Sequence, residues 1–405
     1  MNVIMISPGF PAEMPLFTRA LAQVGASVLG VGDQPQAALE PDVRQALTGY
    51  LQVRNLWEEE QTIAEIQSAV RGKSVDRVEC LWEPGMILAA RLRAALGVPG
   101  MGLEQTKLFR DKESMKQALD RAGIRTPHHF RATNESEVRD AAERIGYPLI
   151  VKPIDGAGSR DTYLLHEAGD LDQALQLVKH VPEVSVEEYI EGEEYTYDTV
   201  CAGREVAFEN VSWYRPKPMF MSKYAWVSPQ SIVFRDLEQE EIAAGRDLGR
   251  RVLEALEFDT GFTHMEWFRT ADGEPVFGEI AARPPGARLV HAMNYSCDTD
   301  LFSGWAEAAC YGRFSQPTEK VFNAGMIFKR AQGEGRISRI EGLQSLLAHF
   351  GEHIANIELS PVGTPKRDHR KVVIGDGWLV VRHPDLQTTI DMSERVATDL
   401  RMYAS

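Results

Sequence analysis

Hydrophobic patterns typical of strands and of helices alternate along the first hundred residues of the chain. Short apolar runs are typical of buried strands, whereas apolar positions three or four residues apart are typical of amphipathic helices. The expected strands are residues 3–6, 27–31 and 77–82, and the expected helices are residues 16–24, 61–70 and 86–96. A strand followed each time by a helix predicts a parallel sheet with crossover helices.

A second region begins near residue 106 and has a mixed pattern. Helices are expected at 111–122 and 238–256, a hairpin at 262–281, and strands at 324–329, 372–374 and 378–381, with two helices beyond residue 315. We expect an N-terminal α/β domain (1–105), a central α+β domain (106–314) with a small mobile lobe at about 120–190, and a C-terminal lobe (315–405). No low-complexity linker separates them, so we expect the C-terminal lobe to pack on the central domain.

The charge of the chain limits the partners that we expect. The 405 residues carry a net charge of -15, so a broad surface for nucleic acid or for an anionic membrane is not expected. No apolar run approaches the ~18 residues of a membrane span, and no signal peptide is recognised, which predicts a cytoplasmic protein. A small anionic ligand stays open, because a few local lysines and arginines are enough to bind one.

The cysteines predict neither a metal site nor a disulfide framework. They are Cys80, Cys201, Cys297 and Cys310, and none of them forms a CxxC pair. We therefore expect reduced, buried thiols.

Two carboxylates in the expected hairpin are the most informative candidates. Asp272-Gly273 is typical of a two-residue turn, and such a turn places Glu266 and Glu279 directly opposite each other. Opposite residues of an antiparallel pair point to the same face, and two like charges there need a positive partner, for which a divalent metal ion is the natural candidate. His264 shares their face, more as a supporting residue than as a ligand. The alternative, a solvated surface pair, is disfavoured because aromatic and aliphatic residues surround both glutamates.

Lysines and small residues earlier in the chain suggest phosphate binding. The apolar run 148–151 ends in Lys152, and the small residues of 156–159 follow almost at once. Small residues let backbone N–H groups approach a phosphate, and lysine supplies a point charge. Lys112, near the start of an expected helix, is a further candidate. Each signal is weak by itself, because solvated lysines and glycine turns are common.

Residues 184–195 read as a strand, a break and a second strand that together contain several carboxylates. Carboxylates after an apolar strand can accept hydrogen bonds from ribose hydroxyls, and backbone groups at the break can contact a purine edge. Taken alone, this segment would favour the alternative of an acidic exposed turn.

Taken in order, these segments resemble the ATP-grasp superfamily. They look most like its carboxylate–amine ligase branch, which includes L-amino-acid ligases and, more distantly, biotin carboxylase and D-alanine–D-alanine ligase. The matching pieces are residues 111–112, 151–153, 156–159, 186–194, 264–266 and 279–284. The resemblance implies an α/β ATP-grasp fold, preceded by a Rossmann-like pre-ATP-grasp domain and followed by a C-terminal lobe.

The resemblance also implies a role for each candidate residue. Lys112 and Lys152 would hold the phosphates of ATP, beneath a loop that contains Gly156, Gly158 and Ser159. Glu188, Tyr189 and Ile190 would frame the adenine, with Glu187 also in the cofactor site, and Glu194 would be the best candidate for a ligand of the ribose. The metal ion, Mg²⁺ or Mn²⁺, would bind Glu266 and Glu279. Arg283, together with Lys152, would steady the transferring phosphoryl group.

Two positions depart from the pattern of the family. Many members have an asparagine where this chain has Ala281, which puts a third protein ligand for a second metal ion in doubt. Water or substrate would then take that place. Pro285-Gly286 stands where many ligases have two glycines, which predicts a stiffer substrate loop.

The implied reaction phosphorylates a small carboxylate and transfers the acyl group to an amine, and the family suggests a homodimer. Arg288 would grip a substrate carboxylate or else form a structural salt bridge. The aromatic and basic residues 212–226 would form a loop that lines a substrate pocket, or else a packed surface loop or dimer contact. Two other functions stay open: an ATP-grasp enzyme with another acceptor, by carboxylation or phosphoryl transfer, and a nucleotide-binding regulator without turnover.

Overall fold

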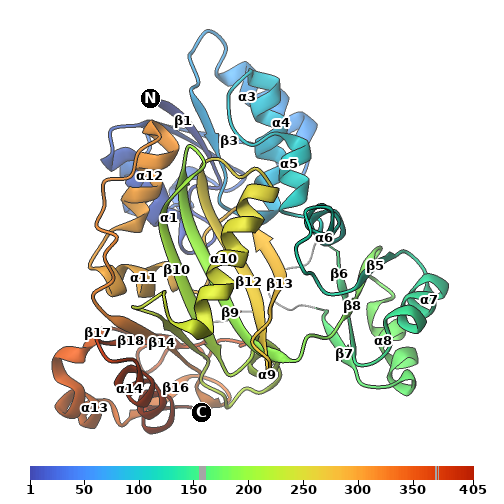
Figure 1. Cartoon of the computed structure of the whole chain (residues 1–405). Helices are drawn as coiled ribbons and strands as arrows, with labels where there is room; N and C mark the ends of the chain where they lie inside the picture. Colours follow the sequence, from blue (N-terminus) through green and yellow to red (C-terminus); the bar gives the residue numbers. More distant parts are fainter. Residues whose placement is uncertain (155–160, 370–371, 373) are drawn as a thin grey trace.

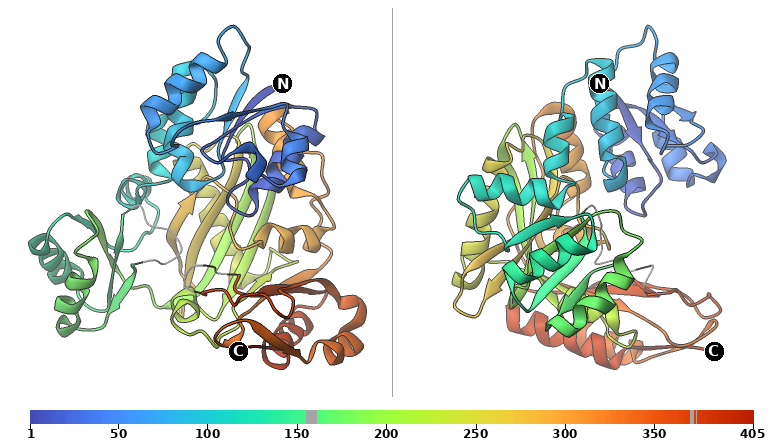
Figure 2. Two further views of the ribbon diagram at one scale, coloured as in Figure 1. Left: turned by 180° about the vertical axis from the view of Figure 1, so that it is seen from behind. Right: turned by 90° about the vertical axis from the view of Figure 1, so that its right-hand side faces the viewer.

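The computed structural model describes residues 1–154, 161–369, 372 and 374–405. These residues are arranged around one large antiparallel sheet, with the N-terminal part at one end of it and the C-terminal part at the other (Figure 1). A small lobe stands to one side of the sheet, and the view from behind shows it apart from the main body (Figure 2, left).

The N-terminal part contains a four-stranded parallel sheet in the order β3-β2-β1-β4. The elements are β1 (Asn2–Ile6), α1 (Met14–Gln23), β2 (Ser27–Gly32), α2 (Pro41–Ala46), β3 (Gly49–Gln52), α3 (Glu59–Ala69), β4 (Arg77–Glu79) and α4 (Met86–Leu96). The expected parallel sheet with crossover helices is confirmed. The strand expected at residues 77–82 is shorter than predicted, because β4 ends at Glu79.

The large sheet has eight antiparallel strands in the order β13-β12-β9-β10-β11-β14-β18-β17. The strands are β9 (Gly192–Ala202), β10 (Glu205–Arg215), β11 (Gln230–Val233), β12 (Gly261–Thr270), β13 (Pro275–Ala281), β14 (Asn323–Lys329), β17 (Ile354–Leu359) and β18 (Gly377–His383). Strands β14, β17 and β18 come from beyond residue 315, so this C-terminal segment extends the central sheet.

Helices cover both faces of the large sheet. Helix α10 (Glu240–Ala255) packs on one face through an apolar cluster that includes Tyr197 and Trp267. The opposite face packs against α11 (Leu289–Cys297) and α12 (Leu301–Tyr311), through a cluster that also contains residues of α1. This second cluster therefore fastens the N-terminal part to the large sheet.

The small lobe contains a four-stranded sheet in the order β5-β8-β6-β7, and α5 and α6 connect this lobe to the N-terminal part. The elements are α5 (Leu103–Leu108), α6 (Lys112–Arg121), β5 (His129–Ala132), α7 (Glu135–Ile145), β6 (Leu149–Pro153), β7 (Tyr163–Leu165), α8 (Leu171–Val178) and β8 (Val184–Glu188). Asp111 caps α6, since its carboxylate accepts the backbone N–H of Ser114 at 2.8 Å. The lobe has an apolar cluster of its own, formed between its sheet and α7 and α8.

The C-terminal residues complete the molecule with a three-stranded sheet and two helices. The elements are β15 (Gln332–Gly333), β16 (Ile337–Glu341), α13 (Leu343–Phe350), α14 (Leu386–Asp399) and β19 (Arg401–Ala404). The strand expected at residues 372–374 was wrong for Val372 and Ile374, which lie outside any strand. The carbonyl of Val372 instead accepts the N–H of Gly375 at 2.9 Å, in a turn.

The single loop expected at residues 212–226 was also wrong. Strand β10 runs as far as Arg215, and helix α9 (Pro218–Lys223) follows it. Aromatic residues fit a pleated sheet surface well, and Trp213 and Tyr214 accordingly lie in β10, where they pair with Ile232 and Ser231 of β11.

The hairpin of β12 and β13 differs from its predicted turn and yet keeps its predicted pairing. The turn has three loop residues, 271–273, because the N–H of Thr270 donates to the carbonyl of Glu274 at 3.1 Å, and Gly273 has the left-handed φ of +89° that such a loop needs. A three-residue loop alone would put Glu266 opposite Gly278. A bulge between Glu266 and Trp267 shifts the register by one residue, and Glu266 pairs with Glu279.

Two further expectations were that the chain has no membrane span and that its cysteines are buried, reduced thiols. Among the residues that the structure describes, none of the helices combines the length and the apolar character that crossing a bilayer demands. All four cysteines are described, and they are buried with free thiols.

We predict that Gly278→Ala destabilises the protein. A Cβ atom at this position would lie 2.8 Å from the carbonyl oxygen of Glu266, and relieving such a contact in a packed sheet costs about 1–3 kcal/mol. Chemical denaturation measures the free energy of unfolding. Gly286→Ala is the matched control, because a Cβ there would meet nothing within 4 Å. An equal effect of the two substitutions would contradict the bulge geometry.

Candidate functional site

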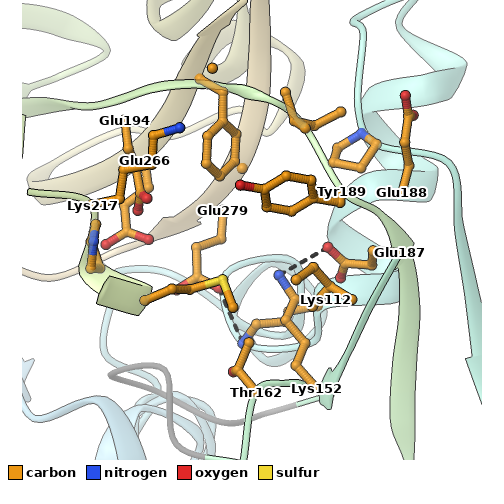
Figure 3. Close-up of a pocket in the computed structure, with 18 of the residues that line it drawn as sticks. Lys112, Lys152, Thr162, Glu187, Glu188, Tyr189, Glu194, Lys217, Glu266 and Glu279 are labelled. Carbon is orange, nitrogen blue, oxygen red and sulfur yellow. Dashed lines mark ion pairs between the residues drawn. The ribbon is translucent and has the colours of Figure 1, made fainter. Parts of the chain in front are cut away.

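A cavity lies between the small lobe and the edge of the large sheet (Figure 3). Its walls come from β6 and β8 of the small lobe, from β9, β12 and β13 of the large sheet, and from the beginnings of α6 and α9. The predicted residues that line it are Lys112, Lys152, Glu187, Glu188, Tyr189, Ile190, Glu194, Glu266 and Glu279. Side chains predicted from separate segments therefore meet at one place.

Glu187 is bound by two lysines on the small-lobe side of the cavity. Its Oε2 atom lies 2.9 Å from the Nζ of Lys152, and its Oε1 atom lies 2.9 Å from the Nζ of Lys116. The hydroxyl of Ser185 also donates to Oε1, at 2.7 Å. Burial opposes the charge of Glu187, yet Lys116 and Lys152 keep its pKa well below the ordinary value. The carboxylate is therefore ionised and fixed by contacts to both of its oxygens.

Carboxylates gather on the opposite wall of the cavity. Glu266 and Glu279 are paired across the hairpin, and Oε2 of Glu279 lies 3.3 Å from the Nζ of Lys112. Although burial opposes its ionisation, Lys112 and Lys152 lower the pKa of Glu279. Burial, and then the charges of Glu266 and Glu279, raise the pKa of nearby Glu194 well above the ordinary value. A cation among these carboxylates would relieve their repulsion.

His264 supports the carboxylate wall from behind. Its Nδ1 atom lies 2.6 Å from a carboxylate oxygen of the buried Asp198, and its Nε2 atom lies 3.7 Å from Oε1 of Glu266. Burial alone would lower the pKa of His264, but Asp198 and then Glu266 raise it to about 9. The imidazolium therefore lies between two carboxylates, as the shared face predicted.

The segment after β8 brings its backbone to the cavity, while the Glu188 carboxylate has partners elsewhere. A guanidinium nitrogen of Arg125 donates to its two oxygens at 3.0 and 3.1 Å, and the backbone N–H of His128 donates to it at 3.0 Å. Tyr189 and Ile190 follow at the break between β8 and β9 and line the cavity. Figure 3 shows Glu188 beyond Tyr189, at the margin of the cavity.

Arg283 lies close to the carboxylate wall but is held by the N-terminal part. β13 ends at Ala281, two residues before Arg283. Its Nε and a terminal nitrogen lie 2.7 and 2.6 Å from Oε2 of Glu83, which also pairs with Arg110. Burial opposes its charge, but Glu83 and then Glu279 raise the pKa of Arg283.

Arg288 precedes helix α11 with an unusual backbone. Its φ is +60°, a left-handed conformation that is uncommon for residues other than glycine, and its N–H donates to Oε1 of Glu13 at 3.0 Å. Among the described residues, no carboxylate lies within 4.0 Å of its guanidinium, and its buried Nε has no hydrogen-bond partner. The guanidinium thus forms no salt bridge within the described part of the chain.

Lys116 was missed by the sequence reasoning, whereas Lys217 and Tyr214 belong to the segment 212–226 that was expected to line a substrate pocket or else to form a packed surface loop or dimer contact. Lys116 follows Lys112 by four residues, a helical spacing that puts both on one face of α6. Lys217 lines the cavity at the start of α9. Burial, and then the charges of Glu266, Asp198 and Glu194, raise the pKa of Tyr214 well above the ordinary value.

Part of the predicted site cannot be placed. Gly156, Gly158 and Ser159, predicted to form a loop over the phosphates, lie outside the described residues.

Comparison with a known family agrees with this geometry. Residues 117–290 match the ATP-grasp domain family, and both the predicted resemblance and the predicted fold class are confirmed. An L-arginine-specific L-amino acid ligase of Bacillus subtilis is 26% identical over 246 residues, which are 58% of this chain and 58% of that protein. A protein of Sinorhizobium fredii is matched over 55% of its own length. The chain thus spans less than two thirds of the length of these two curated relatives.

Solved structures share the fold over the whole chain. An L-amino acid ligase from Bacillus licheniformis superposes with a TM-score of 0.79 at 19% identity, covering 100% of this chain and 98% of that one. An N5-carboxyaminoimidazole ribonucleotide synthetase from Thermotoga maritima gives a TM-score of 0.71 at 18% identity, covering 100% and 99%. At these identities the likeness concerns the fold alone.

We predict that Glu187→Gln destabilises the protein in a pH-dependent manner. Because the folded-state pKa of Glu187 is depressed, its ionisation contributes stability that is present above the unfolded value of about 4.3 and is lost as pH falls below it. The measurement is the free energy of unfolding of both proteins between pH 7 and pH 3. The difference should be largest at pH 7 and shrink below about pH 4.3. A constant difference would contradict the ion-pair account.

Proposed function

Because this chain contains an ATP-grasp domain, we propose that it is an ATP-dependent ligase that joins a small carboxylate to an amine and releases ADP and phosphate. The observation that carries the proposal is the meeting of lysines and carboxylates across one cavity. Lys112 and Lys152 supply positive charge for phosphates, and Glu266 and Glu279 face each other as a metal-binding pair. A site that only held a nucleotide, without turnover, would not need the carboxylate pair of Glu266 and Glu279.

The carboxylate pair fits a magnesium or manganese ion. Mg²⁺ characteristically binds one or two protein carboxylates and completes its shell with phosphate oxygens and water. Within the described part of the chain there is no group of three or more potential metal ligands, which is consistent with a metal ion bound mainly through phosphates. With Ala281 in place of an asparagine, we propose that water or substrate takes the remaining positions. When bound, the ion would neutralise charge that develops on the phosphates.

The remaining cavity residues fit a nucleotide. We assign the adenine to the backbone at Tyr189 and Ile190, beside Glu187 and Glu188, and the ribose hydroxyls to Glu194. Glu194 lines the cavity beside Glu266 and Glu279, where its oxygens could accept hydrogen bonds from ribose hydroxyls. Gly156, Gly158 and Ser159 stay predicted as the loop over the phosphates.

The first chemical step forms an acyl phosphate. A carboxylate oxygen of the substrate attacks the γ-phosphorus, and the bond to the bridging oxygen of ADP breaks. Such a transfer depends mostly on positioning and on neutralisation of charge. Lys152 would hold the phosphates, and Arg283, fixed by Glu83 beside the carboxylate wall, would steady the transferring group.

The second step transfers the acyl group. The amine attacks the carbonyl carbon of the acyl phosphate, phosphate leaves with the electrons of the C–O bond, and the amine loses a proton. We assign the grip on a substrate carboxylate to Arg288, since its Nε atom is buried and lacks a partner among the described residues. The Bacillus subtilis relative is described as specific for L-arginine, which supports an amino acid as the class of carboxylate. A homodimer and a cytoplasmic location stay predictions.

We predict that release of phosphate from ATP requires a metal ion and both substrates. The assay supplies ATP and Mg²⁺ with a panel of amino acids, each alone and in pairs, and measures free phosphate. Glu279→Ala should lower the rate roughly 100-fold or more, a loss comparable to that of other electrostatic groups in active sites. Lys107→Met is the control, because Lys107 is an exposed lysine outside the cavity. Phosphate release that ignores the amine would contradict a ligase, and equal rates in Glu279→Ala and the wild type would contradict this site.

A further inference from the structure

Lys116 is a buried lysine that does not line the cavity. It lies on α6, one turn after Lys112, and its side chain is 0% exposed. Lys112, Lys152 and Glu187 all line the cavity, but Lys116 lies behind them. A lysine is rarely fully buried unless it is paired, so Lys116 is expected to have a buried partner of opposite charge.

The partner of Lys116 is the carboxylate that also holds Lys152. Glu187 lies between the two lysines, with one oxygen 2.9 Å from Lys116 and the other 2.9 Å from Lys152. Its side chain is 4% exposed, and the side chain of Lys152 is 18% exposed. Lys152 lines the cavity and has the most exposed side chain of these three residues.

The arrangement divides the charge of one carboxylate between two ammonium groups. If Glu187 had Lys152 as its only cationic partner, the carboxylate would compete fully with a phosphate for that lysine. Lys116 binds Oε1 of Glu187. This contact weakens the competition between the carboxylate and a phosphate for Lys152, and it keeps the carboxylate in one orientation. The trio then carries a net charge of one positive unit, presented on the cavity side by Lys152.

We propose that Lys116 is a positioning residue for nucleotide phosphates, acting through Glu187 on Lys152. The inference rests on the proposed function, because it takes the cavity to be a nucleotide site. It assigns a role in binding to a residue that touches no ligand. A merely structural Lys116 would contribute to stability and leave the affinity of the folded protein for phosphates unchanged.

The test is the affinity for ADP, measured by isothermal titration calorimetry without carboxylate or amine. We expect Lys116→Met to weaken ADP binding roughly tenfold, the equivalent of about 1.4 kcal/mol for one rearranged charged hydrogen bond. Lys107→Met, at an exposed lysine on the preceding helix, should bind ADP as the wild type does. Thermal unfolding of each variant confirms that the folded protein is being measured.

A double-mutant cycle separates positioning from structure. In the Glu187→Gln background Lys116 has lost the carboxylate through which it acts, so adding Lys116→Met should leave the Kd for ADP unchanged. A further loss in the double variant would overturn the proposal. If Lys116→Met alone fails to fold, Lys116→Gln is the second variant: it keeps a polar partner for Glu187 without the charge, so it should also weaken ADP binding, and unchanged binding would overturn the proposal.

The outcomes also separate this inference from the proposed function. Wild-type protein that binds ADP, with Lys116→Met binding it equally well, would overturn the role of Lys116 and leave the nucleotide site standing. Wild-type protein that does not bind ADP would overturn both.

Discussion

The attraction between a lysine wall and a carboxylate wall is the interaction on which the site depends. Lys112, on α6, lies 3.3 Å from Glu279 on the hairpin, and this contact spans the two sides of the cavity. Each wall alone would carry uncompensated charge in a partly buried place, because positive groups outnumber Glu187 on the side of Lys112, Lys116 and Lys152, and carboxylates gather on the other side. Opposed across the cavity, each wall lowers the electrostatic cost of the other. A nucleotide with a metal ion has the complementary pattern of charges: its phosphates match the lysines, and its metal ion matches the carboxylates.

The geometry of the carboxylate wall is fixed by the backbone of the hairpin. Its three-residue loop and its bulge each shift the pairing by one residue, in opposite senses, and Glu266 and Glu279 end up on one face. Had either feature been absent, the side chain of Glu279 would have pointed to the other face of the sheet. Gly278 lies at the bulge, where a Cβ atom would meet the backbone of Glu266.

Much of the fold and of the site could be predicted from the sequence, for different physical reasons. The parallel N-terminal sheet follows from local hydrophobic periodicity, and the candidate residues follow from a few spaced motifs. The pairing of Glu266 with Glu279 was predicted correctly from a turn that was wrong, because the bulge compensates. Lys116 was missed since its role depends on contact with Glu187, which is distant in sequence. Periodicity within α6 places Lys116 beside Lys112 but does not say what faces it.

Other errors came from competition between local and tertiary preferences. The aromatic residues near 212–226 were taken as a loop, yet Trp213 and Tyr214 belong to β10, where the sheet gives them neighbours on both sides. The pairing of Arg283 with Glu83 of the N-terminal part was not predicted either. Both positions depend on contacts from distant parts of the chain, which no local pattern contains.

The central claim is tested most directly by a crystal structure with a non-hydrolysable ATP analogue and Mn²⁺, using anomalous scattering to locate the metal. The account predicts an anomalous peak in contact with both Glu266 and Glu279, with phosphates between this peak and the ammonium groups of Lys112 and Lys152. A nucleotide bound elsewhere, or a manganese peak that contacts neither glutamate, would contradict it.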